Sequence, residues 1–303
     1  MEEVVAFSPS HITGFFQICD KPADPLLKGS RGAGVSITDG VKTKVTIRKA
    51  PEKSLEIRIN SRKTGSAQVS EWVAKTMLSR IEENYEVVID HLAATPIGFG
   101  FGSSGAGALS LALALNEGFS LGFSPLEAAQ VAHSAEVQCK TGLGTVIAET
   151  YGGVEIRVKP GAPGIGEVRQ IPVDEDYVVT CLAFSPIKTE EALTDNRLRR
   201  RINGFGGKLV DELIGRPQPS NFMRFSRSFA EQIGLISPRM KEVLRETDDA
   251  GLDCSMMMFG ESIFSLVESD AAGKLTRIFH KYAPHRKSVM TSKIDFRGAR
   301  LLW

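Results

Sequence analysis

A dense cluster of glycine and serine lies between residues 96 and 115, in the sequence PIGFGFGSSGAGALSLALAL. Five glycines surround two adjacent serines here: Gly98, Gly100, Gly102, Gly105 and Gly107 around Ser103 and Ser104. Because glycine has no Cβ, a ligand can approach this backbone closely, and consecutive N–H groups can converge on an anion. The apolar helix pattern that follows would add free N–H groups and the positive end of its dipole. The stretch therefore predicts a phosphate-binding loop, whose hydroxyls would contact the phosphate or a bound magnesium ion.

Two common phosphate motifs do not fit this loop. A Walker A loop ends in Lys-Ser/Thr, whereas here Ser104 is followed by glycine. The spacing G-x-G-x-x-G does occur, but a dinucleotide fold also needs a strand after the first helix, with an acidic residue about 20 positions on. Residues 124–138 instead have the pattern of a second helix. A simple helix cap with a glycine hinge is the remaining alternative, and it does not require this density of glycine.

The composition is that of an ordinary globular protein. The chain has 303 residues, 42% hydrophobic and 24% charged, enough for one large or two medium domains. A formal net charge of +1 gives no general attraction to nucleic acid or to membranes. The four cysteines form no C-x-x-C pair, which argues against a zinc ribbon and a disulfide framework. With no signal-peptide pattern and no long apolar run, we expect a cytoplasmic protein.

Polar residues also cluster near the N-terminus. Residues 4–7 have a strand pattern, and we expect Pro9 to end that strand. Residues 8–16 (SPSHITGFF) would then form a loop that contains His11 and is anchored by its two phenylalanines. A β-hairpin turn with incidental polar residues is the open alternative.

A second polar segment, residues 28–34 (KGSRGAG), has the composition of a glycine-rich turn. It holds Ser30 and Arg31 between glycines. An arginine in such a turn is suited to bidentate capture of a carboxylate or phosphate, and an exposed arginine in a flexible turn is an equal alternative.

A helix is predicted from Ser124 to about Cys139, because S-P-L-E is a capping box with proline at the first helical position. Glu136 shares a face with Ala129 and Ala132 near the end of this helix. A carboxylate there is disfavoured by the apolar face and by the negative end of the dipole, the latter by about 0.3–1 kcal/mol. At this position Glu136 therefore needs a compensating cation nearby. The alternative is that its side chain lies on the solvated surface.

Taken together, these segments resemble the GHMP kinases, the superfamily of galactokinase, homoserine kinase, mevalonate kinase and phosphomevalonate kinase. The loop from Pro96 to the serine pair is similar to their phosphate loop, and SPSHITGFF with GSRGAG is most similar to the archaeal pantoate kinase branch. The resemblance implies an α+β fold with an N-terminal nucleotide-binding domain (residues 1–163) and a ferredoxin-like C-terminal domain (164–303). The glycine-rich segment 159–166 would link the two domains, and the resemblance also implies a homodimer.

The resemblance further implies that the chain uses ATP and Mg²⁺ to phosphorylate the hydroxyl of pantoate, on the way to coenzyme A. ATP would bind to the glycine-rich loop: Pro96, Gly98, Gly100, Gly102, Ser103, Ser104, Gly105 and Ala106. Ser104 and Glu136 would hold the magnesium ion. Another superfamily kinase, acting on homoserine or a mevalonate derivative, is the first alternative. A catalytically silent relative that only binds nucleotide is the second.

On the substrate side, the resemblance implies that Ser30, Arg31 and Gly32 bind the pantoate carboxylate. His11 would orient the reacting hydroxyl, at a position where many relatives have lysine or arginine.

Two features of the superfamily are missing. Mevalonate and galactose kinases place an aspartate near the substrate hydroxyl, where this chain has Thr145, or Gly144 if a gap is shifted. Thr145 therefore takes that place among the catalytic candidates, and Glu149 is a less favoured substitute. Phosphoryl transfer tolerates such a loss, because its loose transition state depends mainly on positioning and electrostatics. The third motif, normally glycine-rich, keeps only Gly260 after three methionines.

Overall fold

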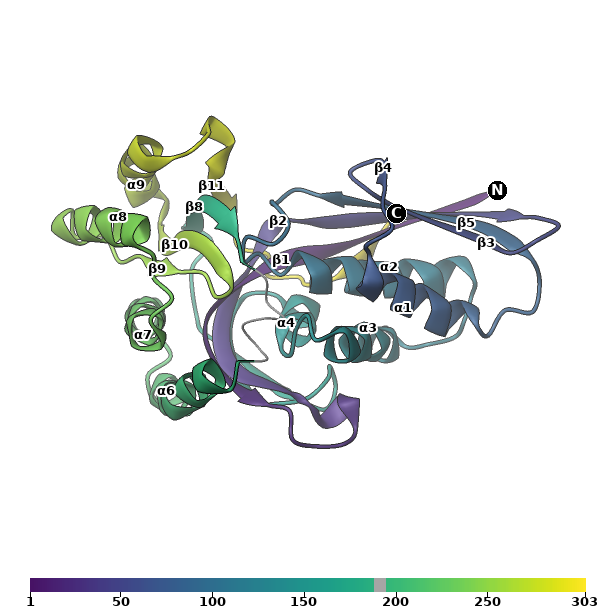
Figure 1. Ribbon diagram of the computed structural model, residues 1–303, viewed down its shortest axis with the longest axis horizontal. Helices are drawn as coiled ribbons and strands as arrows, with labels where there is room; N and C mark the ends of the chain where they lie inside the picture. The colour runs from purple at the N-terminus through teal and green to yellow at the C-terminus, as the bar shows by residue number, and fades with distance from the viewer. Residues whose placement is uncertain (188–194) are drawn as a thin grey trace.

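The computed structural model describes residues 1–187 and 195–303 of the chain. Two sheets, each accompanied by helices, form the two halves of the molecule (Figure 1). This mixed arrangement confirms the predicted α+β class. Within the described residues, no helix is both long and apolar enough to cross a membrane.

The first sheet has eight strands, with the main order β12-β1-β2-β5-β3-β4. A short branch extends it, because β6 pairs with the first part of β2 and β7 pairs with β6. The strands are β1 (Glu2–Cys19), β2 (Gly29–Lys49), β3 (Ser54–Ile59), β4 (Arg62–Lys63), β5 (Tyr85–Ala93), β6 (Val154–Lys159), β7 (Glu167–Gln170) and β12 (Arg300–Leu302).

Helix α2 (Ser103–Gly118) packs directly on this sheet, and eleven of its residues are buried. Helices α1 (Gln68–Leu78) and α3 (Pro125–Cys139) pack against α2 (Figure 1). Helix α3 begins with the predicted capping box at Ser124. A short helix, α4 (Thr145–Tyr151), follows α3 and contacts both α2 and β1.

The second sheet has four antiparallel strands in the order β11-β8-β10-β9. Helix α6 (Asn196–Gly215) packs against β1, β2 and β6 of the first sheet and against α7. Helices α7 (Pro219–Ile233), α8 (Pro238–Asp249) and α9 (Ser269–Tyr282) contact the second sheet. Its strands are β8 (Tyr177–Pro186), β9 (Ser255–Met256), β10 (Gly260–Glu268) and β11 (Val289–Lys293).

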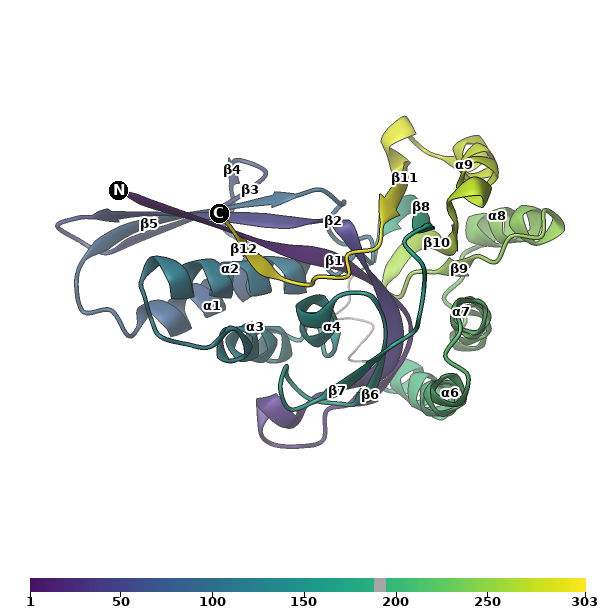
Figure 2. The same ribbon diagram turned by 180° about the vertical axis from the view of Figure 1, so that it is seen from behind.

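The end of the chain returns to the first sheet, where β12 lies antiparallel beside β1 (Figure 2). The segment 159–166, expected to link two domains, instead connects β6 to β7 within that sheet. Its Ala162 is fully buried, and Ala162 N–H donates to the Leu26 carbonyl. The division of the chain at residues 163 and 164 stays a prediction.

Two local expectations about the N-terminal segments are wrong. Pro9 does not end the first strand: β1 continues to Cys19, and the register with β2 shifts between Ser8 and Ser10. A bulge accommodates proline because the bulged residue makes no ladder hydrogen bond. The segment 28–34 is likewise no turn, since β2 begins at Gly29 and pairs with β1 from there.

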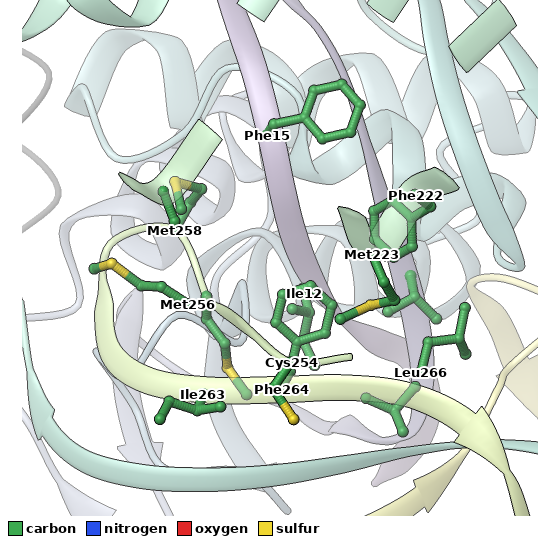
Figure 3. Packing of buried hydrophobic residues seen from close by; sticks show 14 of the residues in the cluster. Ile12, Phe15, Phe222, Met223, Cys254, Met256, Met258, Ile263, Phe264 and Leu266 are labelled. Atoms are coloured by element: carbon green, nitrogen blue, oxygen red, sulfur yellow. The ribbon is translucent and has the colours of Figure 1, made fainter. Parts of the chain in front are cut away.

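The expected aromatic anchors are confirmed, and the three methionines before Gly260 belong to the core. Phe15 and Phe16 are buried, and the Phe15 ring lies within 6.5 Å of three phenylalanine rings of α7. Met256, Met257 and Met258 are buried in the same hydrophobic cluster, which joins β1 to the second sheet (Figure 3). This shared core fixes β1, and with it His11, relative to the second half of the molecule.

Candidate active site

A cavity of about 640 Å³ lies between the glycine-rich loop, strands β1, β2 and β6, and the Met258–Phe259 segment before β10. Its volume falls within the usual range for small-molecule sites. Most of the predicted site residues line it: His11, Ser30, Gly98, Gly100, Gly102, Ser103, Ser104, Glu136 and Thr145. Pro96, Arg31, Gly32, Gly105 and Ala106 do not line it.

One wall of the cavity is the glycine-rich loop. Gly98, Gly100 and Gly102 have φ values of 86°, 93° and 66°, in the left-handed region that favours glycine. Gly102 is the N-cap of α2, and no side chain caps this helix end. The N–H groups of the first helical turn have no partner within the helix, so they are free to bind an anion.

Two glycines at the start of α2 are required by close packing. A Cβ at Gly102 would lie 2.6 Å from Cγ2 of Thr145, and a Cβ at Gly105 would lie 2.9 Å from Oε2 of Glu149. Gly260 is equally restricted, because its Cβ would lie 1.9 Å from the Phe99 carbonyl oxygen. The single glycine kept from the third motif thus lets this segment approach the phosphate loop.

Ser104 and Glu136 meet at the end of the loop. The Ser104 hydroxyl donates to Oε1 of Glu136 over 2.6 Å, and the Thr141 hydroxyl donates to the same oxygen over 2.7 Å. Glu136 is buried, so the surface alternative for this residue is wrong. Burial raises the pKa of the Glu136 carboxyl, and the two hydroxyl donors oppose that rise.

This pair of oxygen donors fits a magnesium ion. Mg²⁺ prefers hard oxygen ligands and commonly takes one or two from the protein, with phosphate oxygens and water completing its shell. In the described part of the chain, no group of three His, Cys, Asp or Glu residues is arranged to hold a metal. A magnesium site formed by Ser104 and Glu136 and completed by nucleotide phosphates agrees with this pair of oxygens and with the lack of a larger ligand cluster in the described residues.

A second wall consists of side chains from three strands: His11 and Thr13 of β1, Ser30 of β2 and Arg157 of β6. Arg157 is 1% exposed and forms an ion pair with Glu155. Its Nε is buried and has no hydrogen-bond partner among the described residues. Because a buried donor without an acceptor is costly, this N–H group is suited to receive an anionic ligand.

Ser30 lies close to this guanidinium. A Cβ at Gly144 would lie 2.1 Å from Oγ of Ser30 and 2.9 Å from Nε of Arg157, so both groups converge beside the same backbone. His133 of α3 supports this arrangement, since its Nε2 lies 3.0 Å from the Lys28 carbonyl oxygen, immediately before β2.

Arg31 points away from the cavity. Neighbouring residues of a strand face opposite sides, so Ser30 and Arg31 cannot both reach it. The Arg31 guanidinium pairs instead with Asp211 over 2.5 Å and donates to the Val158 carbonyl over 2.9 Å. Gly32 contributes indirectly, because it leaves room for the Arg157 guanidinium: a Cβ at this position would lie 2.7 Å from Nη2 of Arg157.

Sequence reasoning missed Arg157, although one signal was present. In the strand sequence VEIRV, Glu155 and Arg157 alternate with apolar residues, which places two opposite charges on one face of a buried strand. Buried charges of this kind are normally paired with each other or with a ligand.

Helix α4 carries the residue at the missing aspartate's position. Thr145 begins α4 and lines the cavity. Glu149 lies one turn later, fully buried behind the glycine-rich loop, and within the described part of the chain neither of its carboxylate oxygens has a hydrogen-bond partner. Burial, followed by the charges of Glu136 and Glu155, raises its pKa well above the ordinary value.

Comparison with known proteins agrees with this geometry. Residues 69–153 match the model of the GHMP kinases N terminal domain, a stretch that includes the phosphate loop and Glu136. The chain is 37% identical to the pantoate kinase of Thermococcus kodakarensis over 277 residues, which cover 90% of both chains. The chain belongs to the pantoate kinase family. The family relationship confirms the resemblance seen in the sequence.

Two further relatives support the same assignment. The pantoate kinase of Methanocaldococcus jannaschii is 33% identical over 87% of this chain and 93% of its own. A solved structure titled "Phosphotransferase related to CoA biosynthesis pathway" aligns with a TM-score of 0.88 and 32% identity, covering 99% of this chain and 98% of that one. The fold and the two-domain plan of a GHMP kinase therefore apply to almost the whole chain.

Proposed function

We propose that this protein transfers the γ-phosphate of ATP to the hydroxyl of pantoate, with Mg²⁺ as cofactor. The observation that carries the proposal is one cavity with an anion-binding loop on one wall and a buried, partly unpaired arginine on the other. The loop is suited to the phosphates of ATP, and the arginine is suited to a carboxylate. The identity of the substrate is inferred from the pantoate kinase relatives.

The chain's own residues position the two reactants. The free N–H groups at the start of α2 would bind the transferred phosphate, and Ser104 with Glu136 would hold the cation. When bound, Mg²⁺ neutralises charge on the phosphate oxygens. Arg157 and Ser30 would bind the carboxylate, in place of the Arg31 expected from the sequence.

The cavity favours pantoate over homoserine. Phe16 and Phe259 line it with their rings 5.5 Å apart, and Leu143 adds further apolar surface. This surface suits the dimethyl carbon of pantoate, whereas homoserine would place an ammonium group close to the Arg157 guanidinium. A mevalonate derivative fits less directly, since the acidic partner that its kinases use is replaced by Thr145.

The test is ADP release from Mg-ATP with pantoate, homoserine and mevalonate offered in parallel. We expect turnover with pantoate alone. Turnover with another acceptor would support the kinase activity but contradict pantoate as the substrate. ATP binding without turnover of any acceptor would place the chain among nucleotide-binding relatives without kinase activity.

Two further proposals follow from the family. We propose a homodimer in the cytoplasm, with no nucleic acid or membrane partner, because the resemblance implies the dimer and the composition suits a soluble enzyme. Sedimentation equilibrium of the purified chain tests the dimer, and a species of 32.9 kDa at micromolar concentration would contradict it.

A further inference from the structure

His11 lies at the cavity wall with a partner at each ring nitrogen. Its Nε2 is 2.9 Å from Oε1 of Glu155, and its Nδ1 is 3.3 Å from Oγ1 of Thr13. The imidazole is 1% exposed, and Glu155 is fully buried behind it. His11 and Thr13 both line the cavity, whereas Glu155 does not.

These contacts favour one tautomer of His11. Glu155 forms an ion pair with Arg157, and a carboxylate only accepts hydrogen bonds. Nε2 therefore carries the proton and donates it to Glu155, beside the Arg157 Nη1 that donates to the same oxygen. The contact between Nε2 and Nη1 of Arg157 is longer, at 3.3 Å. Nδ1 is left with a free lone pair, which accepts a hydrogen bond from the Thr13 hydroxyl.

The cavity offers few other proton acceptors. Of the described residues that line it, the ionisable ones are His11, Glu136 and Arg157. Glu136 is occupied by Ser104 and Thr141, and a guanidinium has no lone pair to accept a proton. Thr145, at the position of the superfamily aspartate, is not a base. His11 is therefore the acceptor that the geometry leaves available.

We propose that the proton of the substrate hydroxyl reaches Nδ1 of His11 through the Thr13 hydroxyl, with Glu155 as the residue that positions His11. This inference rests on the proposed kinase function. As the alcohol O–H bond breaks, its proton passes to Oγ1 of Thr13, and the Thr13 proton passes to Nδ1. The alcohol oxygen forms the new bond to the γ-phosphorus. The bond from that phosphorus to the β–γ bridging oxygen breaks, and ADP leaves with the electron pair.

After transfer, His11 is a cation stabilised by the Glu155 carboxylate 2.9 Å away, and it returns its proton to water when the products leave. Thr13 is a catalytic residue in this scheme because it would touch the substrate hydroxyl. Glu155 acts only through His11. The same arrangement of carboxylate, imidazole and hydroxyl activates alcohols in enzymes with unrelated folds.

The first test compares Thr13→Val with Thr13→Ser in the full chain, using Mg-ATP and pantoate. Valine keeps the shape but removes the hydroxyl, so we expect kcat to fall about 100-fold, the lower range for lost acid–base catalysis. KM for both substrates should change less than about threefold, and serine should restore most of kcat. Thr46→Val, a buried-threonine control on β2 outside the cavity, should leave both constants unchanged.

Thr13→Val with a kcat within threefold of the wild type would overturn the relay. Failure of the proposed function looks different, because the wild type would then not phosphorylate pantoate. In that case the same three variants are compared on whichever alcohol the enzyme accepts, and the expected ratios do not change.

A second test reads the tautomer without any turnover. In ¹⁵N-labelled protein, we expect the His11 imidazole to carry its proton on Nε2, with the signal assigned by its loss in His11→Gln. Glu155→Gln presents an amide that can donate to Nε2, so the proton should move to Nδ1 and kcat should fall. A wild-type ring protonated on Nδ1, or a Glu155→Gln enzyme with unchanged kcat, would contradict the positioning role.

Discussion

The two walls of the cavity are built in different ways. The wall proposed to bind phosphate, here called the phosphate wall, is one continuous stretch of chain, residues 98–104, whose proposed binding groups are backbone N–H groups at the start of α2. The second wall draws side chains from β1, β2 and β6, which meet only because those strands pair in one register. A wall made of backbone is encoded locally, and a wall made of side chains depends on the whole sheet.

The largest expected effect lies at Glu136, whose carboxylate accepts a hydrogen bond from Ser104 at the end of the phosphate wall. Glu136→Gln removes the negative charge that, with Ser104, would hold the cation, and we expect kcat to fall about 100- to 1000-fold. KM for pantoate should change little, since the second wall is intact. Steady-state kinetics over a range of Mg²⁺ concentrations measure both. A Glu136→Gln enzyme with wild-type kcat and Mg²⁺ dependence would remove this residue from the metal site.

A change in the backbone of the same wall should be slightly milder. Gly102→Ala forces a Cβ to within 2.6 Å of Thr145 Cγ2 at a φ of 66°, so we expect the loop to shift and kcat/KM for ATP to fall about 100-fold. Gly122→Ala is the matched control, because Gly122 has a φ of 76° with nothing within 4 Å of its Cβ. Equal effects of the two substitutions on kcat/KM would mean that the loop geometry is not what binds ATP.

The smallest expected effect concerns His91, which contacts α2 through Thr43. His91 Nδ1 lies 2.7 Å from Oγ1 of Thr43, which in turn lies 2.6 Å from Oγ of Ser110 in α2. Burial lowers the pKa of His91 to about 4. Below its ordinary pKa of about 6.5, the unfolded chain binds a proton that the folded chain excludes until about pH 4, so folding weakens as the pH falls through this window.

At pH 5 this difference should cost about 2 kcal/mol relative to pH 7. The free energy of unfolding, measured by denaturant titration at both pH values, should therefore fall less in His91→Gln than in the wild type. An identical pH dependence in both proteins would show that His91 does not carry this effect.

The conformation of the loop in the phosphate wall could be predicted from the sequence for a physical reason. Left-handed glycines and an uncapped helix start are properties of neighbouring residues, so the loop 98–104 could be recognised without the fold. The partnership of Ser104 with Glu136 came from the family resemblance, and the geometry brings the two residues together. The α+β class and the capping box at Ser124 could also be predicted from the sequence.

The second wall could not be predicted in the same way. Arg31 was chosen because glycines surround it, yet strand alternation turns it toward Asp211. Arg157 reaches the cavity because β6 pairs with β2 so that Gly32 lies opposite Arg157. Likewise, the contact of His11 with Glu155 joins residues 144 positions apart. Such contacts depend on strand order and register, which local composition does not specify.

The most direct test of this account compares Arg157→Lys with Arg31→Lys, using KM for pantoate. Lysine keeps the charge but lacks the planar fork that binds a carboxylate through two N–H groups. We expect Arg157→Lys to raise KM for pantoate about tenfold or more, with KM for ATP nearly unchanged. Arg31→Lys should leave both constants within about twofold of the wild type. The reverse pattern, a raised KM for pantoate in Arg31→Lys alone, would contradict the placement of the carboxylate at Arg157.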